Sequence, residues 1–263
     1  MIRFIVTDVD GTLVKDGSPE VYPELFDVVK QLKKKGIVFA VASGRQYDSI
    51  RRMFEPIAND MIFIAENGSH VVCRGQEMDV TLMDPHMARE VILELRTLGE
   101  GYDLVVSTPN GCYIESNNKQ FLDLIRYGYR NKMTLVEDVL KESLSINKIA
   151  VFHRPSIRDI GEERLIPKWK DKLKVCMAGE DWVDFMDLSV DKGKAIEKIQ
   201  KFLGILPEET MAFGDNGNDL GMMKMAKESY AVETGREEVK KAAKYICGSY
   251  EKKGVYQVMK SLL

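Results

Sequence analysis

The stretch Asp8-Val9-Asp10-Gly11-Thr12-Leu13 follows directly after the apolar run Ile-Arg-Phe-Ile-Val-Thr at residues 2–7. A short run rich in Ile, Val and Phe that is stopped by Gly predicts a buried strand. Ligands of open α/β sheets bind just beyond the carboxyl ends of such strands, so Asp8 and Asp10 stand where chemistry is expected. Two carboxylates that face one crevice repel each other unless a cation is present, and Mg²⁺ with oxygen ligands fits that need. Taken alone, Asp10-Gly11-Thr12 is explained equally well as a turn.

The composition is that of an ordinary globular protein. The chain has 263 residues, of which 44% are hydrophobic and 30% charged, enough for one large or two modest domains. A net charge of −3 without a basic stripe argues against nucleic-acid binding. The four cysteines form no CxxC pair, which argues against a zinc site or a disulfide framework. The apolar start is too short for a signal peptide and no run reaches the length of a membrane span, so we expect a cytoplasmic protein.

The first part of the chain alternates strands and helices. Apolar residues between positions 21 and 32 recur at helical spacing, and residues 37–42 form a second apolar run that ends in Ser43-Gly44-Arg45. A short helix and a third strand at 61–65 follow. Continuous apolar strands that alternate with helices predict a Rossmann-like, doubly wound, mostly parallel sheet.

The pattern changes in the middle of the chain. Short strands pair there as hairpins, for example across Asn110-Gly111. We expect residues 83–187 to form an inserted α+β cap with an antiparallel sheet. Helices and apolar strands alternate again from 188 to 263, so residues 1–82 and 188–263 together would complete one core domain.

Polar groups recur at the rim of this predicted core. After Asp8 and Asp10 come Ser43, Lys192 and the stretch Gly-Asp-Asn-Gly-Asn-Asp at 214–219. Carboxylates hold a metal ion, whereas hydroxyl, amide and ammonium groups bind phosphate oxygens, so the set suits a phosphate bound with Mg²⁺. Each group alone has a simpler explanation as a helix cap, a turn or an exposed side chain. Their succession at the rim of one sheet, with Lys192 at a helix start rather than a strand end, favours a phosphate site.

These motifs resemble those of the haloacid dehalogenase superfamily, in particular its Cof-type phosphatases with a large cap inserted after the third core strand. The resemblance covers the whole chain and consists of DVDGT at 8–12, SGR at 43–45, DKGKA at 191–195 and GDNGND at 214–219. It implies Asp8 as the nucleophile that forms an aspartyl-phosphate and Asp10 as the general acid and base.

The resemblance also implies the other site residues. Phosphate contacts would come from Val9, Ser43, Gly44, Lys192 and Asn218. Mg²⁺ would be held by Asp8, the main-chain carbonyl of Asp10, and Asp215, with Asp219 in a supporting role. Arg45 either reaches a substrate anion or pairs with a carboxylate of the core.

The expected activity is hydrolysis of a small phosphorylated metabolite, such as a sugar phosphate or a similar monoester, by a monomer or weak homo-oligomer. Two alternatives stay open. A phosphomutase uses the same aspartyl-phosphate but returns the phosphoryl group to the substrate. A signalling module phosphorylated on Asp also combines these groups, although Asp10 should make its phospho-aspartate short-lived.

Overall fold

Strand β1 (Phe4–Asp8) lies inside an eight-stranded sheet in the computed structural model, which describes residues 1–263. In spatial order the strands are β14 (Tyr245–Cys247), β13 (Glu228–Val232), β12 (Thr210–Gly214), β1, β2 (Val38–Ala42), β3 (Ile62–Ala65), β4 (His70–Cys73) and β5 (Gln76–Val80). Neighbouring strands from β14 to β3 run parallel, and β4 is antiparallel to β3. The predicted Rossmann-like, mostly parallel sheet is confirmed.

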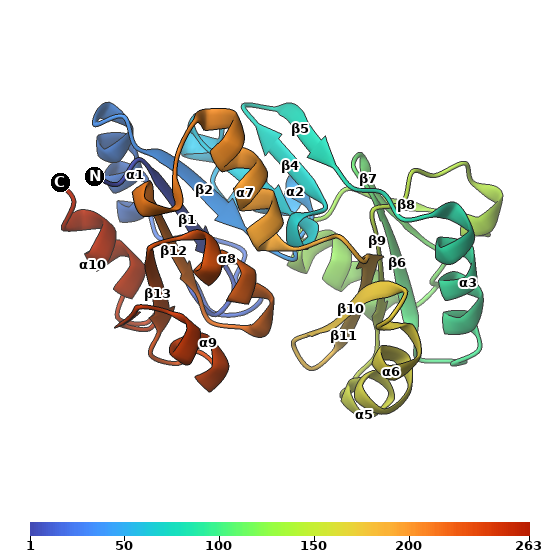
Figure 1. The fold of residues 1–263 in the computed structure, drawn as a ribbon. Coiled ribbons are helices and arrows are strands. Elements are labelled where there is room, and N and C mark those ends of the chain that lie inside the picture. The colour runs from blue at the N-terminus through green and yellow to red at the C-terminus, as the bar shows by residue number, and fades with distance from the viewer. The chain divides into compact units, whose positions relative to one another are not determined.

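Helices cover both faces of this sheet (Figure 1). Successive residues of β1 point to opposite faces, so Ile5 belongs to one hydrophobic cluster and Phe4 and Val6 to the other. The helices on the Ile5 side are α1 (Glu24–Lys34), α2 (Tyr47–Met53) and α10 (Gly254–Lys260), with the 3₁₀ turn η1 (Glu55–Asp60). Those on the opposite side are α7 (Lys192–Leu203), α8 (Leu220–Met225) and α9 (Glu237–Ala242). Single 3₁₀ turns stand at η2 (Glu66–Gly68), η6 (Pro207–Glu209) and η7 (Gly217–Asp219).

The ends of α7 follow from its sequence. The Asp191 carboxylate accepts hydrogen bonds from the main-chain N–H groups of Gly193 (2.8 Å) and Lys194 (3.2 Å), as an N-cap residue does. Gly204 ends the helix in the left-handed conformation, with a φ of 61°. The Asp191 cap therefore fixes the point at which the helix starts, with Lys192 as its first residue.

A second unit contains a six-stranded sheet. Its strands, in spatial order, are β10 (Leu173–Ala178), β11 (Trp182–Asp187), β9 (Lys148–Phe152), β6 (Asp103–Thr108), β7 (Gly111–Ile114) and β8 (Met133–Leu135). The expected antiparallel pairing holds for all neighbours except β7 and β8, which run parallel. This exception arises because a helical segment connects the two strands and carries the chain back to the starting edge.

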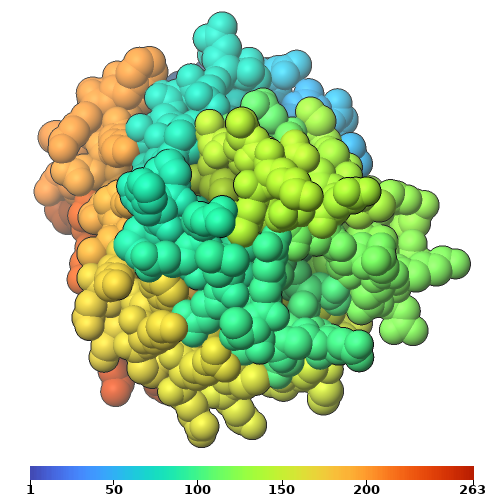
Figure 2. Space-filling model, turned by 90° about the vertical axis from the view of Figure 1, so that its right-hand side faces the viewer, coloured from blue at the N-terminus to red at the C-terminus, as the bar shows by residue number.

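Helices pack on both faces of the six-stranded sheet as well. On one face lie α3 (Pro85–Arg96) and the segment made of α5 (Arg158–Ile160), the π turn η5 (Gly161–Leu165) and α6 (Ile166–Trp169). The Trp169 indole donates a hydrogen bond to Glu94 of α3 (2.8 Å), and Figure 2 shows the teal segment with α3 beside the yellow segment with α6. On the other face lie α4 (Lys119–Asp123) and the π turn η3 (Leu124–Gly128), and a 3₁₀ turn stands at η4 (Val139–Lys141).

Backbone contacts divide the chain into two units. One comprises Met1–Met78 and Asp191–Leu263, and the other comprises Asp79–Val190. The boundaries expected from the sequence, at 82/83 and 187/188, lie a few residues away. None of the helices combines the length and the apolar character that crossing a membrane requires.

Candidate active site

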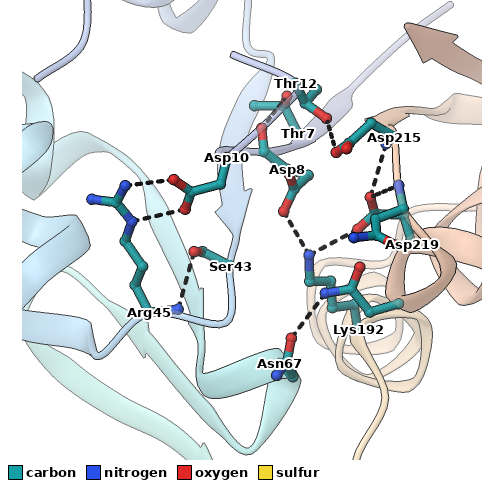
Figure 3. A network of polar contacts seen from close by, with 12 residues as sticks. Thr7, Asp8, Asp10, Thr12, Ser43, Arg45, Asn67, Lys192, Asp215 and Asp219 are labelled. Carbon is teal, nitrogen blue, oxygen red and sulfur yellow. Dashed lines mark hydrogen bonds and ion pairs between the residues drawn. The ribbon is translucent and has the colours of Figure 1, made fainter. Parts of the chain in front are cut away.

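The carboxyl ends of β12, β1 and β2 lie side by side, and polar residues follow each of them. The chain continues from β1 to β2 on one side, whereas β12 lies on the other side of β1. The strand order therefore reverses beside β1, which is where open α/β sheets form a ligand-binding crevice. Figure 3 shows Asp8, Ser43, Lys192 and Asp215 gathered at this edge.

Lys192 joins two carboxylates in the interior. Its Nζ donates to Asp8 Oδ1 (2.6 Å) and to Asp219 Oδ1 (2.8 Å), and only 1% of the lysine is exposed. Burial opposes the charge of this ammonium group, but Asp219 and Asp8 outweigh it and raise the pKa of Lys192 above its ordinary value. The sequence-predicted Asp8, Lys192 and Asp219 are thus brought into direct contact.

Asp8 itself is buried at the end of β1. Burial raises the pKa of its carboxyl well above the ordinary value, Lys192 lowers it, and the nearby Asp219 and Asp215 raise it again. Without a further cation, the crevice holds more negative charge than Lys192 alone offsets.

The loop after β12 supplies Asp215 and Asp219. The main-chain N–H of Asp215 (2.9 Å) and that of Asn216 (3.1 Å) donate to Asp219 Oδ2, and Asp219 is fully buried. Thr12 donates to Asp215 Oδ1 (2.8 Å) from the turn after β1. Burial raises the pKa of Asp215 to about 6, the charge of Asp219 adds to this, and the Thr12 hydroxyl opposes it.

A glycine is required where the two loops meet. Gly11 has a φ of +80°, and a Cβ there would lie 2.5 Å from Asp215 Oδ2. Any side chain at this position would displace Asp215 and would also strain the backbone. The Asp10-Gly11-Thr12 segment is therefore a turn, as one explanation of the sequence holds, and it also forms one wall of the site.

The donor set fits a hard divalent cation. Carboxylate oxygens of Asp8, Asp215 and Asp219 lie within 4.8 Å of one another. Asp219 uses both oxygens in hydrogen bonds, whereas Asp8 and Asp215 each use only Oδ1. Oδ2 of Asp8 and Oδ2 of Asp215 are thus the carboxylate atoms available to Mg²⁺, which takes oxygen ligands.

Asp10 and Arg45 form an ion pair beside Asp8. Arg45 Nε donates to Asp10 Oδ2 (2.7 Å) and Arg45 Nη2 donates to Asp10 Oδ1 (2.5 Å), as Figure 3 shows. Of the two expectations for Arg45, the structure shows pairing with a core carboxylate. Ser43 lies next to this pair, and its Oγ accepts a hydrogen bond from the main-chain N–H of Arg45 (3.1 Å).

Asn67 is a site residue that the motifs did not name. The Asn218 side-chain amide donates to Asn67 Oδ1 (3.0 Å), and a Cβ on Gly44 would lie 3.2 Å from the same oxygen. Asn67 adopts a left-handed φ of 58° after β3, which Asn tolerates better than most residues. The polar turn Glu66-Asn67-Gly68 at the end of a predicted strand was the available signal.

Val9 lies at the same edge but offers no side-chain chemistry. Its side chain is buried in the hydrophobic cluster, and its carbonyl accepts the N–H groups of Leu13 (2.9 Å) and Val14 (3.0 Å). Any contact of Val9 with phosphate would therefore come from its main-chain N–H.

Comparison with known proteins agrees with this geometry. A family model described as haloacid dehalogenase-like hydrolase matches residues 5–259. The chain is 28% identical over 269 residues to the 5-amino-6-(5-phospho-D-ribitylamino)uracil phosphatase YbjI of Escherichia coli (strain K12), covering 100% of this chain and 96% of that one. It is 25% identical over 288 residues to the phosphatase YwpJ of Bacillus subtilis (strain 168), with both chains covered completely.

A solved structure is similar in fold and sequence. A crystal structure of a protein from Eubacterium rectale superposes with a TM-score of 0.88 and 35% identity, over 100% of this chain and 99% of that one. The family match spans nearly the whole chain and includes all four motifs. The chain therefore belongs to the haloacid dehalogenase-like hydrolase family, as the motifs predict, and it is a phosphatase.

Proposed function

We propose that this phosphatase hydrolyses small phosphate monoesters, sugar phosphates or similar compounds, with Mg²⁺ and through an aspartyl-phosphate on Asp8. The observation that supports this most is the buried contact of Lys192 with Asp8 and Asp219. It holds the Asp8 carboxylate through Oδ1, which keeps a second lone-pair position for attack on phosphorus, while Oδ2 stays available to Mg²⁺. The Lys192 ammonium group beside Asp8 would also offset the negative charge that develops on a transferring phosphoryl group.

In the first step, an Asp8 oxygen attacks phosphorus and the ester P–O bond breaks. The leaving oxygen takes a proton from the Asp10 carboxyl, so the products are an aspartyl-phosphate and an alcohol. Proton transfer from a positioned group contributes typically about 10²–10⁴-fold to such a step.

In the second step, water attacks phosphorus and gives its proton to Asp10. The bond between Asp8 and phosphorus breaks, inorganic phosphate leaves, and both carboxyl groups return to their first state. Splitting the displacement in this way replaces one difficult step by two easier ones.

The phosphoryl oxygens would be held by Ser43, Lys192 and Asn218, together with the main-chain N–H groups of Val9 and Gly44. Gly44 allows the backbone to approach closely, because it carries no side chain. Asn67 orients Asn218 through the 3.0 Å hydrogen bond.

Mg²⁺ would be held by Asp8 Oδ2, Asp215 Oδ2 and the Asp10 carbonyl. When bound, it neutralises charge on the phosphoryl group and on the surrounding carboxylates. Asp219 supports the site by holding Lys192 and the main chain of Asp215.

Residues 79–190 supply none of these groups, so we assign them the role of selecting the leaving group. The E. coli relative is named for a phosphoribitylamino compound, which makes sugar and sugar-alcohol phosphates the first substrates to examine. Specificity would then reside in the second unit and phosphoryl transfer in the first.

The test is phosphate release from p-nitrophenyl phosphate and from a panel of phosphorylated sugars and sugar alcohols, with and without MgCl₂. We expect Asp8→Asn to reduce release to background for every substrate, because the amide cannot attack phosphorus. The control is Asp60→Asn, which neutralises a carboxylate that pairs with Lys33 on the surface and should leave activity unchanged.

Two further readouts separate the alternatives. A phosphoryl group trapped on Asp8 by acid quench and located by mass spectrometry would support the covalent route. An Asp8→Asn variant that keeps full activity would refute the proposal, and isomerised sugar phosphate instead of inorganic phosphate would assign the chain to the mutases.

A further inference from the structure

The ion pair between Arg45 and Asp10 has a geometry that goes beyond the family motifs. The guanidinium donates to both carboxylate oxygens, from Nη2 to Oδ1 at 2.5 Å and from Nε to Oδ2 at 2.7 Å. Such a two-point contact fixes the plane of the carboxylate as well as its distance. Figure 3 shows the two side chains facing each other beside Ser43.

Arg45 is the anchored member of the pair. Its side chain is only 7% exposed, whereas the Asp10 side chain is 28% exposed. Its main-chain N–H donates to Ser43 Oγ (3.1 Å), and its carbonyl accepts the N–H of Glu66 (3.0 Å). Arg45 Nη1 also contacts Met53 Sδ at 3.3 Å. The surrounding structure thus holds the guanidinium in place, and the guanidinium holds Asp10.

The two oxygens of Asp10 are not equivalent. Oδ1 accepts from Arg45 Nη2 and also from the main-chain N–H of Gly17 (3.0 Å). Oδ2 accepts only from Arg45 Nε. A carboxylate oxygen has two lone-pair positions, so Oδ2 keeps one that can carry a proton.

We propose that Arg45 is the positioning residue for Asp10, and that Asp10 Oδ2 is the atom that exchanges the proton with the leaving group and with water. This inference rests on the proposed function. When the ester bond breaks, the Oδ2 proton moves to the leaving oxygen. When water attacks the aspartyl-phosphate, a water proton returns to Oδ2.

The test compares phenyl phosphate with p-nitrophenyl phosphate, because p-nitrophenolate leaves readily without a proton and phenolate does not. Arg45→Gln removes the two-point contact. We expect kcat/KM to fall about 100-fold for phenyl phosphate and less than about tenfold for p-nitrophenyl phosphate, within the range that proton transfer contributes. Arg45→Lys keeps the positive charge but lacks the planar guanidinium that donates to both carboxylate oxygens. Its decrease in kcat/KM should therefore lie between those of wild type and Arg45→Gln.

A second readout addresses the water step. With p-nitrophenyl phosphate the first step needs no acid, but the second still needs Asp10 as base. Arg45→Gln should therefore release p-nitrophenol in a burst that precedes phosphate release, and phosphorylated Asp8 should accumulate. A purely structural role would slow both steps together and give no burst.

The matched control is Arg51→Gln, which breaks a partly exposed arginine–carboxylate pair with Glu55 (2.8 Å). It should change neither the ratio of the two substrates nor the burst. Thermal melting of all variants checks that they fold. If Arg45→Gln does not fold, the two substrates are compared with Arg45→Lys instead.

Equal losses for both substrates without a burst would overturn the inference. So would a rise in KM at unchanged kcat, which would make Arg45 a substrate-binding group. If no phosphorylated Asp8 is trapped even in the wild type, the proposed function fails first. If it is trapped but the substrate ratio does not change, only the role of Arg45 fails.

Discussion

At Asp215 the folded protein holds a carboxyl group where its charge is disfavoured. Burial and the charge of Asp219 raise its pKa to about 6, from an ordinary value of 3.8, even though Thr12 donates a hydrogen bond to it. The folded chain therefore binds this proton more tightly than the unfolded chain does. At every pH at which the Asp215 carboxyl of the unfolded chain is ionised, this group therefore lowers the free energy of unfolding.

The raised pKa of Asp215 predicts how the stability of the metal-free protein changes with pH. Near pH 3.5 Asp215 is largely protonated in both states and contributes little. As the pH rises through about 6, the folded state becomes less stable, and the full penalty is about 3 kcal/mol. Asp215→Asn should therefore raise the free energy of unfolding at pH 7.5 in EDTA, and this gain should disappear near pH 3.5. Urea denaturation at a series of pH values measures it.

The matched control is Asp10→Asn, which also replaces a carboxylate by an amide at the same edge. Because Asp10 accepts two charged hydrogen bonds from Arg45, this change should lower stability at pH 7.5 rather than raise it. If Asp215→Asn instead lowers the free energy of unfolding at pH 7.5, other groups of the folded state must offset the charge of Asp215, and the prediction is wrong.

Most of the site could be predicted from the sequence because its residues stand in short motifs at strand ends or, for Lys192, at the start of a helix. The motifs placed Asp8, Lys192 and Asp219 at one edge, and the structure brings these into contact. They could not show Asn67, because its contact with Asn218 depends on how β3 and the loop after β12 approach in space. Nor could spacing decide whether Arg45 faces Asp10.

At the scale of elements, helix α7 carries Lys192 at its first position. The Asp191 side chain caps the helix through Gly193 and Lys194, which fixes where the first turn begins. Lys192 must reach Asp8 and Asp219 from that turn, at 2.6 and 2.8 Å. The cap therefore contributes to stability and to the placement of the ammonium group.

Asp191→Ala should lower the free energy of unfolding by about 1 kcal/mol, the usual effect of losing an N-cap. It should also lower kcat about tenfold, because small displacements of a catalytic group weaken catalysis. Asp191→Asn keeps a capping oxygen and should stay close to wild type in both. Chemical denaturation measures the free energy of unfolding of both variants, and steady-state kinetics measures their kcat. Equal decreases in the two variants would mean that the charge of Asp191, not its capping hydrogen bonds, matters.

The elements that the sequence did not predict lack a strong local signal. Strand β8 has only three residues, Met133–Leu135, two of them exposed, so it shows no clear alternation. The helical segment from Arg158 to Trp169 is divided by a π turn at Gly161–Leu165. A Cβ on Gly161 would lie 2.6 Å from Met177 Sδ and 2.9 Å from Val183 Cγ2, so a larger residue would displace these side chains, a tertiary contact that sequence periodicity does not report.

At the scale of the whole molecule, the hydrophobic core is divided in the same way as the chain. Two clusters pack on the faces of the eight-stranded sheet and two others on the six-stranded sheet. Each of the four clusters draws all of its residues from a single unit. We therefore expect a ligand held by one unit to stabilise mainly that unit.

This division makes the proposed Mg²⁺ site testable by hydrogen exchange. Asp8 and Asp215 both belong to the first unit, so Mg²⁺ at 100 times its Kd should slow exchange there by an amount equivalent to about 2.7 kcal/mol. Amides of β1 and β12 should respond, and those of β9 and β11 should not. EDTA should reverse the effect, and Asp215→Asn should weaken it because one ligand oxygen is lost. Protection confined to β9 and β11, or none at saturating Mg²⁺, would contradict a cation site between Asp8 and Asp215.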